Sequence, residues 1–118
     1  LPVHDRGNQT RTFCYVSDGI TGFFQGLLSG INGQVYNVGN DTDEINIMSL
    51  AETVAALFKN KPEIRMIAYP QKYPSDEPRR RCPDLTKIKT ELGYLPRVDL
   101  TTGLKRTLSW FRETYPTV

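Results

Sequence analysis

Helix-forming stretches and short β-rich runs alternate along this chain, and the alternation limits its possible folds more than any other feature. Residues 35–40 form a short β-rich run that ends near a glycine, and they follow a stretch with helical periodicity. A sharply bounded strand after a helix is typical of a parallel α/β sheet. We therefore expect an α/β fold. The helical stretch carries an apolar stripe at i, i+3, i+4, i+7 and i+8: Ile20, Phe23, Phe24, Leu27 and Leu28.

The remaining elements follow from the same patterns. Strands are expected over residues 1–4, 9–16 and 64–69, and Ser17 with Asp18 is a credible cap for the first helix. Ser49 opens a second helix as part of a capping box with Glu52. A short third helix follows Asp84 and closes at Gly93, and a fourth covers about 101–115, before Pro116. The side chains expected to face inward on these three helices are Leu50, Val54, Leu57, Phe58, Leu85, Ile88, Leu92, Leu104, Leu108, Phe111 and Tyr115.

Three glycines, Gly19, Gly22 and Gly26, lie along one flank of the first helix. Each interior glycine costs about 1 kcal/mol of helix stability relative to alanine. Their presence indicates that another backbone approaches closely there, although a loosely specified helix is the alternative.

The strands expected in this chain are too few for the helices that should cover them. A parallel sheet needs several strands and helices on both faces. The 118 residues suffice for one domain with a modest core. Because strands are few, we interpret residues 1–118 as the part of a larger fold that covers its sheet. The chain begins with Leu1 in strand-like sequence, and we expect a fragment or a processed product of a longer protein.

Composition excludes several classes of function. A net charge of +2 is too small to indicate a polyanionic partner such as nucleic acid. Cys14 and Cys82 stand far apart, without a CxxC pair or clustered histidines, so neither a disulfide scaffold nor a metal site is expected and a reducing cytoplasm is favoured. No apolar run approaches the roughly 20 residues that a membrane span needs.

A proline- and arginine-rich segment covers residues 73–84. Arg79, Arg80 and Arg81 stand between Pro78 and Pro83, which favour a stiff, extended backbone. Guanidinium groups held in this way suit a carboxylate or a phosphate. A solvated basic loop is the alternative. Nucleic-acid binding by the three arginines is a weaker hypothesis, because no stacking aromatic residues accompany them.

Four segments, taken in order, resemble one family: QTRTFCYVSD at residues 9–18, YNVGN at 36–40, RCPD at 81–84 and LGYLP at 92–96. They are similar to the C-terminal portion of extended short-chain dehydrogenase/reductases acting on nucleotide sugars, such as UDP-glucuronate decarboxylases, UDP-glucose 4-epimerases and dTDP-glucose 4,6-dehydratases. The resemblance implies the substrate-binding portion of a Rossmann-type enzyme, with short strands covered by about four helices. It implies the family rather than the sugar, the base or the reaction.

The resemblance also implies a set of substrate-binding residues. Arg11 and Arg81 would reach the substrate diphosphate from two sides, and Asp84 would accept hydrogen bonds from ribose hydroxyls. Pro2 and His4 would frame the uracil or thymine ring. The chemistry agrees, because arginines bind phosphate in bidentate fashion whereas a carboxylate repels phosphate but accepts from a hydroxyl. Incidental surface or strand positions for Arg81 and His4, and a simple helix cap for Asp84, are the alternatives.

Two motifs of such enzymes are absent from the sequence. The chain has no Gly-x-Gly-x-x-Gly fingerprint and no suitably spaced Tyr-x-x-x-Lys pair, so we expect no catalytic residue and no cofactor site. The resemblance implies that NAD is bound by a missing N-terminal part, that this chain alone is inactive, and that the intact enzyme is a homodimer using a UDP- or dTDP-sugar. The alternative is a stand-alone, non-catalytic nucleotide-sugar-binding or regulatory module.

Overall fold

The computed structural model describes residues 1–70 and 78–115. Residues 71–77, which include the expected Tyr73–Pro74 start of the arginine-rich segment, and Pro116 lie outside the described residues. The chain divides into two compact units. The first comprises Leu1–Arg11 and Glu44–Arg81, and the second comprises Thr12–Asp43 and Cys82–Val118.

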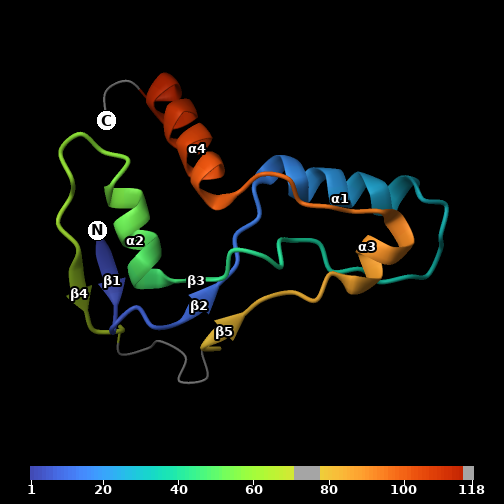
Figure 1. The fold of residues 1–118 in the computed structure, drawn as a ribbon, viewed down its shortest axis with the longest axis horizontal. Coiled ribbons are helices and arrows are strands. Elements are labelled where there is room, and N and C mark those ends of the chain that lie inside the picture. The colour runs from blue at the N-terminus through green and yellow to red at the C-terminus, as the bar shows by residue number, and fades with distance from the viewer. Residues whose placement is uncertain (71–77, 116–118) are drawn as a thin grey trace. The chain divides into compact units, whose positions relative to one another are not determined.

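The first unit contains a parallel strand pair covered by a helix (Figure 1). Strand β1 (Pro2–His4) pairs with β4 (Arg65–Ile67) in the register Val3↔Met66, and α2 (Ile47–Ala55) contacts β1. The side chains buried in this unit are Val3, Ala51 and Ala55. The expected strands at 1–4 and 64–69 are thus present in shorter form.

The same unit holds a small three-stranded sheet whose central strand is β2 (Thr10–Arg11). Strand β3 (Ile45–Asn46) pairs with β2 in the antiparallel sense. Strand β5 (Arg80–Arg81) pairs with the other edge of β2 in the parallel sense. Of the extended run expected over residues 9–16, only Thr10 and Arg11 form a strand. Helix α1 begins at Val16, the last residue of that run.

Helix α2 begins earlier than its sequence pattern predicts. Asn46 is the N-cap, and its Oδ1 accepts from the Ser49 N–H at 2.7 Å, so the capping box assigned to Ser49 is wrong. At the start of α2, the Ile47 N–H donates to the Gln9 carbonyl and the Met48 N–H donates to the Gly7 carbonyl, at 3.1 Å each. These long-range acceptors set the start of the helix. The expected inward side chains are only partly buried: Leu50, Val54, Leu57 and Phe58.

The described part of the second unit has three helices: α1 (Val16–Leu28), α3 (Thr86–Leu92) and α4 (Leu100–Thr114). Tyr94 is 1% exposed and packs with Leu85 and Ile88. Its hydroxyl donates to the Gly39 carbonyl at 2.7 Å, and burial raises the pKa of the phenol, with a smaller contribution from the hydrogen bond to Cys14. Gly93 closes α3 in the left-handed conformation, as its sequence predicts (φ 67°).

Asp18 does not cap α1. The helix begins at Val16, which places Asp18 in its first turn, and Asp18 is 8% exposed. Its Oδ2 accepts from the backbone N–H groups of Arg97 and Val98, at 3.0 and 2.8 Å. The carboxylate therefore holds the connection between α3 and α4 against α1, a contact that no local pattern predicts.

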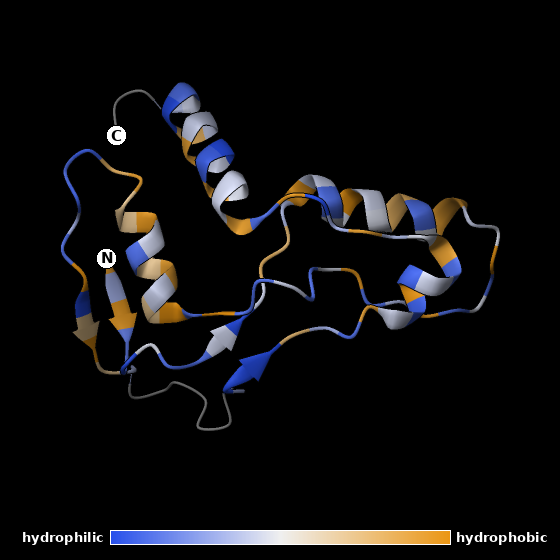
Figure 2. Ribbon diagram, in the orientation of Figure 1, coloured by the Kyte–Doolittle hydropathy of each residue, from blue (hydrophilic) through white to orange (hydrophobic). Residues whose placement is uncertain are grey.

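Helix α1 carries many hydrophobic residues along its length (Figure 2). The side chains of its apolar stripe are exposed within the second unit. Phe23 is 62% exposed and Leu28 is 77% exposed, whereas the buried positions of α1 are Asp18 and Gly22. The helix thus packs in its unit by its glycine flank. Residues 35–40 form no strand among the described residues, since no described strand pairs with them.

Helix α4 also packs through a glycine. Asp99, one residue before the helix start, is its N-cap. Its Oδ1 accepts from the Thr102 N–H at 2.9 Å. A Cβ at Gly103 would lie 3.1 Å from the Tyr15 ring, so small size is needed there. Of the expected inner face, Leu104 and Leu108 are partly buried, whereas Phe111 (40%) and Tyr115 (47%) are exposed.

We expect Gly22→Ala to destabilise the second unit and Gly26→Ala to stabilise it. A Cβ at Gly22 would lie 2.6 Å from Val38 Cγ1 and 2.9 Å from the Tyr94 ring, whereas one at Gly26 meets nothing within 4 Å. Overpacking of this kind costs roughly 1–3 kcal/mol, and Gly→Ala in an open helix position gains up to about 1 kcal/mol. Urea unfolding of both variants measures the difference. Equal effects of the two substitutions would contradict the packing described.

Candidate functional site

Two arginines far apart in the sequence lie side by side on neighbouring strands. Strands β2 and β5 are parallel, and Arg11 is the register partner of Arg81. Neighbouring strands lie about 4.8 Å apart, and paired residues project their side chains from the same face of the sheet. The structure therefore brings Arg11 and Arg81, hereafter the arginine pair, to one face of the small sheet. Figure 1 shows β5 beside β2.

The backbone around the arginine pair orients Arg11. Its Nη1 donates to the Thr10 carbonyl at 2.8 Å and to the Arg79 carbonyl at 3.4 Å. The Arg79 carbonyl also accepts from the Thr10 N–H at 2.8 Å, which ties β2 to the residue before β5. Arg11 is partly buried and Arg81 is exposed. The guanidinium of Arg11 is thus held at the junction of the two strands.

The opposite face of the same strand pair carries an ion pair. Successive side chains alternate between faces, so Thr10 and Arg80 project away from the arginine pair. Arg80 donates to Glu44 from Nε (2.9 Å to Oε1) and Nη2 (2.8 Å to Oε2), and the Thr10 hydroxyl donates to the same carboxylate. These hydrogen bonds, that of Arg80 first, lower the pKa of Glu44. No local pattern points to Glu44, because its contact with Arg80 spans 36 positions.

His4 and Pro2 lie on β1, with Val3 buried between them on the other face. The His4 ring stacks on Tyr69, with ring centroids 5.1 Å apart and planes 5° from parallel, and Nδ1 lies 3.3 Å from the Ala68 carbonyl. Gln9 Nε2 donates to the Tyr69 hydroxyl at 3.0 Å, which fixes the stack. No local pattern points to roles for Tyr69 and Gln9, since nothing near them in the sequence links them to His4.

Asp84 belongs to the second unit and follows Arg81 by three residues in sequence. Its Oδ1 accepts from the Thr86 N–H at 2.9 Å, at the start of α3. Hydrogen bonding to Thr86 lowers the pKa of Asp84, and the side chain is exposed. Asp84 is therefore an ionised acceptor held in place by the helix that it helps to begin.

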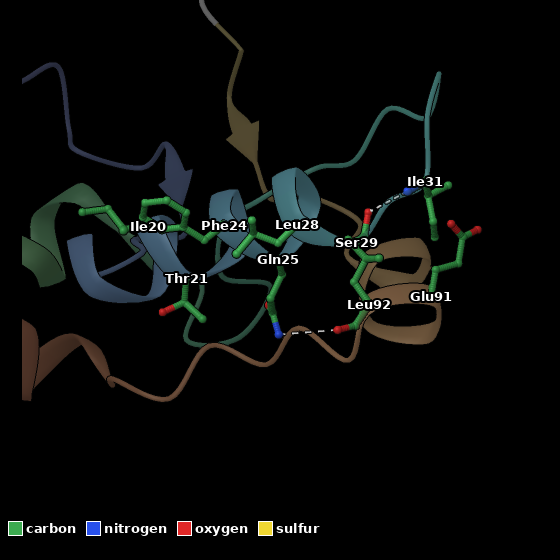
Figure 3. Close-up of a pocket in the computed structure, with 9 residues that line it drawn as sticks. All are labelled: Ile20, Thr21, Phe24, Gln25, Leu28, Ser29, Ile31, Glu91 and Leu92. Atoms are coloured by element: carbon green, nitrogen blue, oxygen red, sulfur yellow. Dashed lines mark hydrogen bonds between the residues drawn. The ribbon is translucent and has the colours of Figure 1, made fainter.

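A hollow in the second unit is unrelated to these residues (Figure 3). It measures about 600 Å³ and is lined mainly by the apolar face of α1, including Ile20, Phe24 and Leu28, together with Leu92. Gln25 Nε2 donates across it to the Leu92 carbonyl at 3.4 Å. The lining contains none of the five expected substrate-binding residues and offers no cation to a phosphate.

In residues 1–70 and 78–115 no three His, Cys, Asp or Glu side chains gather as metal ligands. No helix in this described part is both long and apolar enough to cross a membrane. The whole sequence lacks the glycine fingerprint that a dinucleotide pyrophosphate requires, so these residues do not fit NAD.

The fold has close counterparts among solved structures. UDP-glucuronic acid 4-epimerase from Bacillus cereus, in complex with UDP-glucuronic acid and NAD, superposes with a TM-score of 0.84 at 26% identity, over 98% of this chain and 36% of that one. The chain therefore has the α/β fold of the C-terminal portion of an extended, Rossmann-type short-chain dehydrogenase/reductase, as its motifs predict.

The sequence relatives are enzymes of nucleotide sugars. The chain is 35% identical to UDP-N-acetyl-alpha-D-glucosaminuronate decarboxylase of Bacillus cytotoxicus, over 96% of this chain and 36% of the relative. It is 42% identical to UDP-glucuronic acid decarboxylase 5 of Arabidopsis thaliana, over 88% of this chain and 29% of the relative. No family model matches. The chain is thus homologous to nucleotide-sugar decarboxylases and spans about a third of their length.

We expect Glu44 to make stability depend on pH in the acidic range. Its carboxyl pKa is lowered in the folded protein from an ordinary 4.5, so its stabilising contribution is present above that value and is lost as the pH falls through the lower, folded pKa. The difference in unfolding free energy between the unaltered chain and Glu44→Gln should shrink on acidification from about pH 7 to about pH 3. Urea unfolding across this range tests it, and parallel pH profiles would contradict it.

Proposed function

We propose that this chain is the nucleotide-sugar-binding portion of an NAD-dependent decarboxylase, epimerase or dehydratase, and that Arg11 and Arg81 bind the diphosphate of a UDP- or dTDP-sugar. The observation that carries the proposal is the register of β2 and β5, which puts the two arginines side by side. The homology to UDP-sugar decarboxylases supports the class of ligand.

The arginine pair has the chemistry that a diphosphate requires. A diphosphate carries about two negative charges at neutral pH, and each guanidinium can donate two parallel hydrogen bonds to phosphate oxygens. Because both arginines project from paired strands, their backbones are already ordered before the ligand arrives. Ordering that precedes binding reduces the entropy lost on association.

The other proposed contacts involve Asp84, which follows Arg81 by three residues, and Pro2 and His4, which lie in the first unit. Asp84 accepts hydrogen bonds from the ribose hydroxyls, since its lowered pKa keeps it ionised at neutral pH. Pro2 and His4 frame the base, and the stack on Tyr69 holds the imidazole plane in one orientation for this contact.

The proposed role of this chain in the reaction is binding and orientation alone. NAD is bound, and the sugar chemistry is carried out, by residues outside these 118, because the chain lacks both the glycine fingerprint and the Tyr-x-x-x-Lys pair. We accordingly propose that the chain alone is inactive and that the intact protein is a cytoplasmic homodimer. Binding energy from the nucleotide end of a substrate can position its distant reacting group.

Titration of the chain with UDP tests the arginine pair. We expect Arg11→Ala and Arg81→Ala each to weaken UDP binding by roughly 10- to 100-fold, since a hydrogen bond to a charged group contributes about 1.5–3 kcal/mol. Arg65→Ala is the matched control, because Arg65 lies on β4 and pairs with Glu63. Uridine, which has no diphosphate, should bind weakly and should not respond to either substitution. Isothermal titration calorimetry measures all of these affinities.

The outcomes separate the proposals. Unchanged UDP affinity in the Arg11→Ala, Arg81→Ala double variant would remove the diphosphate assignment. A reading frame that continues upstream of Leu1 through a Gly-x-Gly-x-x-Gly and a Tyr-x-x-x-Lys motif favours the enzyme. A start codon immediately before Leu1 favours the stand-alone binding module.

A further inference from the structure

We propose that Glu44 is a positioning residue for the arginine pair: its ion pair with Arg80, on the opposite face of the sheet, fixes β5 beside β2 and so sets the spacing of Arg11 and Arg81. The inference rests on the proposed function, because it concerns how the same diphosphate site is held. Glu44 itself does not contact the ligand in this proposal.

Glu44 joins all three strands of the small sheet. It immediately precedes β3, receives the Arg80 guanidinium from β5 and receives the Thr10 hydroxyl from β2. Because β2 and β5 are strands of two residues each, few backbone hydrogen bonds hold them together. A side-chain connection between such short strands contributes a larger share of their pairing than it would in a long ladder.

The ion pair is of the kind that contributes to stability despite its exposure. Exposed salt bridges usually contribute little, but bidentate arginine–carboxylate geometry is the recognised exception. Arg80 donates to both oxygens of Glu44, with side chains 65% (Arg80) and 29% (Glu44) exposed.

The chain offers a matched control for this ion pair. Glu63 accepts from Nε and Nη2 of Arg65, at 2.9 and 2.6 Å, with side chains 68% and 74% exposed. This pair joins residues two positions apart on one segment and connects no strands of the small sheet. Its removal should therefore change surface charge by the same amount without changing the arginine pair.

The test measures UDP affinity in Glu44→Ala, Glu44→Gln and Glu63→Ala. We expect Glu44→Ala to weaken UDP binding roughly tenfold, which corresponds to about 1.4 kcal/mol, with a smaller loss in Glu44→Gln and none in Glu63→Ala. The exchanged pair Glu44→Arg with Arg80→Glu should recover much of the affinity. Amide hydrogen exchange of Thr10, whose N–H donates to the Arg79 carbonyl, should accelerate in Glu44→Ala and not in Glu63→Ala.

The outcomes distinguish this inference from the proposed function. If UDP binds and depends on Arg11 and Arg81 but not on Glu44, the positioning role is wrong and the diphosphate site stands. If the unaltered chain does not bind UDP, both are overturned. A loss of affinity in Glu44→Ala that the exchanged pair does not recover, with Thr10 exchange unchanged, also overturns the positioning role.

Discussion

The parallel pairing of β2 with β5 is the interaction on which the proposed site depends. Each strand has two residues, yet their register makes Arg11 and Arg81 neighbours and turns Thr10 and Arg80 to the other face. The first face carries the two guanidinium groups of the proposed anion site, and on the second face Glu44 pairs with Arg80. The proposed site thus rests on very little backbone.

The second unit is organised around Tyr94 and two glycines. Gly22 admits the Tyr94 ring against α1, and Gly103 admits Tyr15 against α4, so both helices pack by their small residues. The apolar stripe of α1 consequently points away from this core. A helix with apolar residues on one side and glycines on another can pack by either side. Helix α1 packs by its glycine side, because the buried Tyr94 ring lies against Gly22.

Several sequence predictions were right because their causes are local. Gly93 ends α3 through its own left-handed conformation, and the extended runs expected at residues 1–4 and 64–69 contain β1 and β4. The predicted caps at Ser49 and Asp18 were wrong for the opposite reason. Backbone acceptors from residues 7–9 start α2 early, and Asp18 serves a segment distant in sequence. Contacts between residues far apart in the sequence produce no periodic pattern of residue types from which they could be predicted.

The sequence by itself determined the family, the presence of arginines suited to a diphosphate, and the lack of a dinucleotide fingerprint, because these reside in residue types and their order. The tertiary structure alone decided that Arg11 and Arg81 are register partners, that Glu44 holds Arg80, and that His4 stacks on Tyr69. Each of these contacts joins residues separated by many positions. Strand register and side-chain pairing across such distances depend on the packing of the whole unit, which local patterns do not encode.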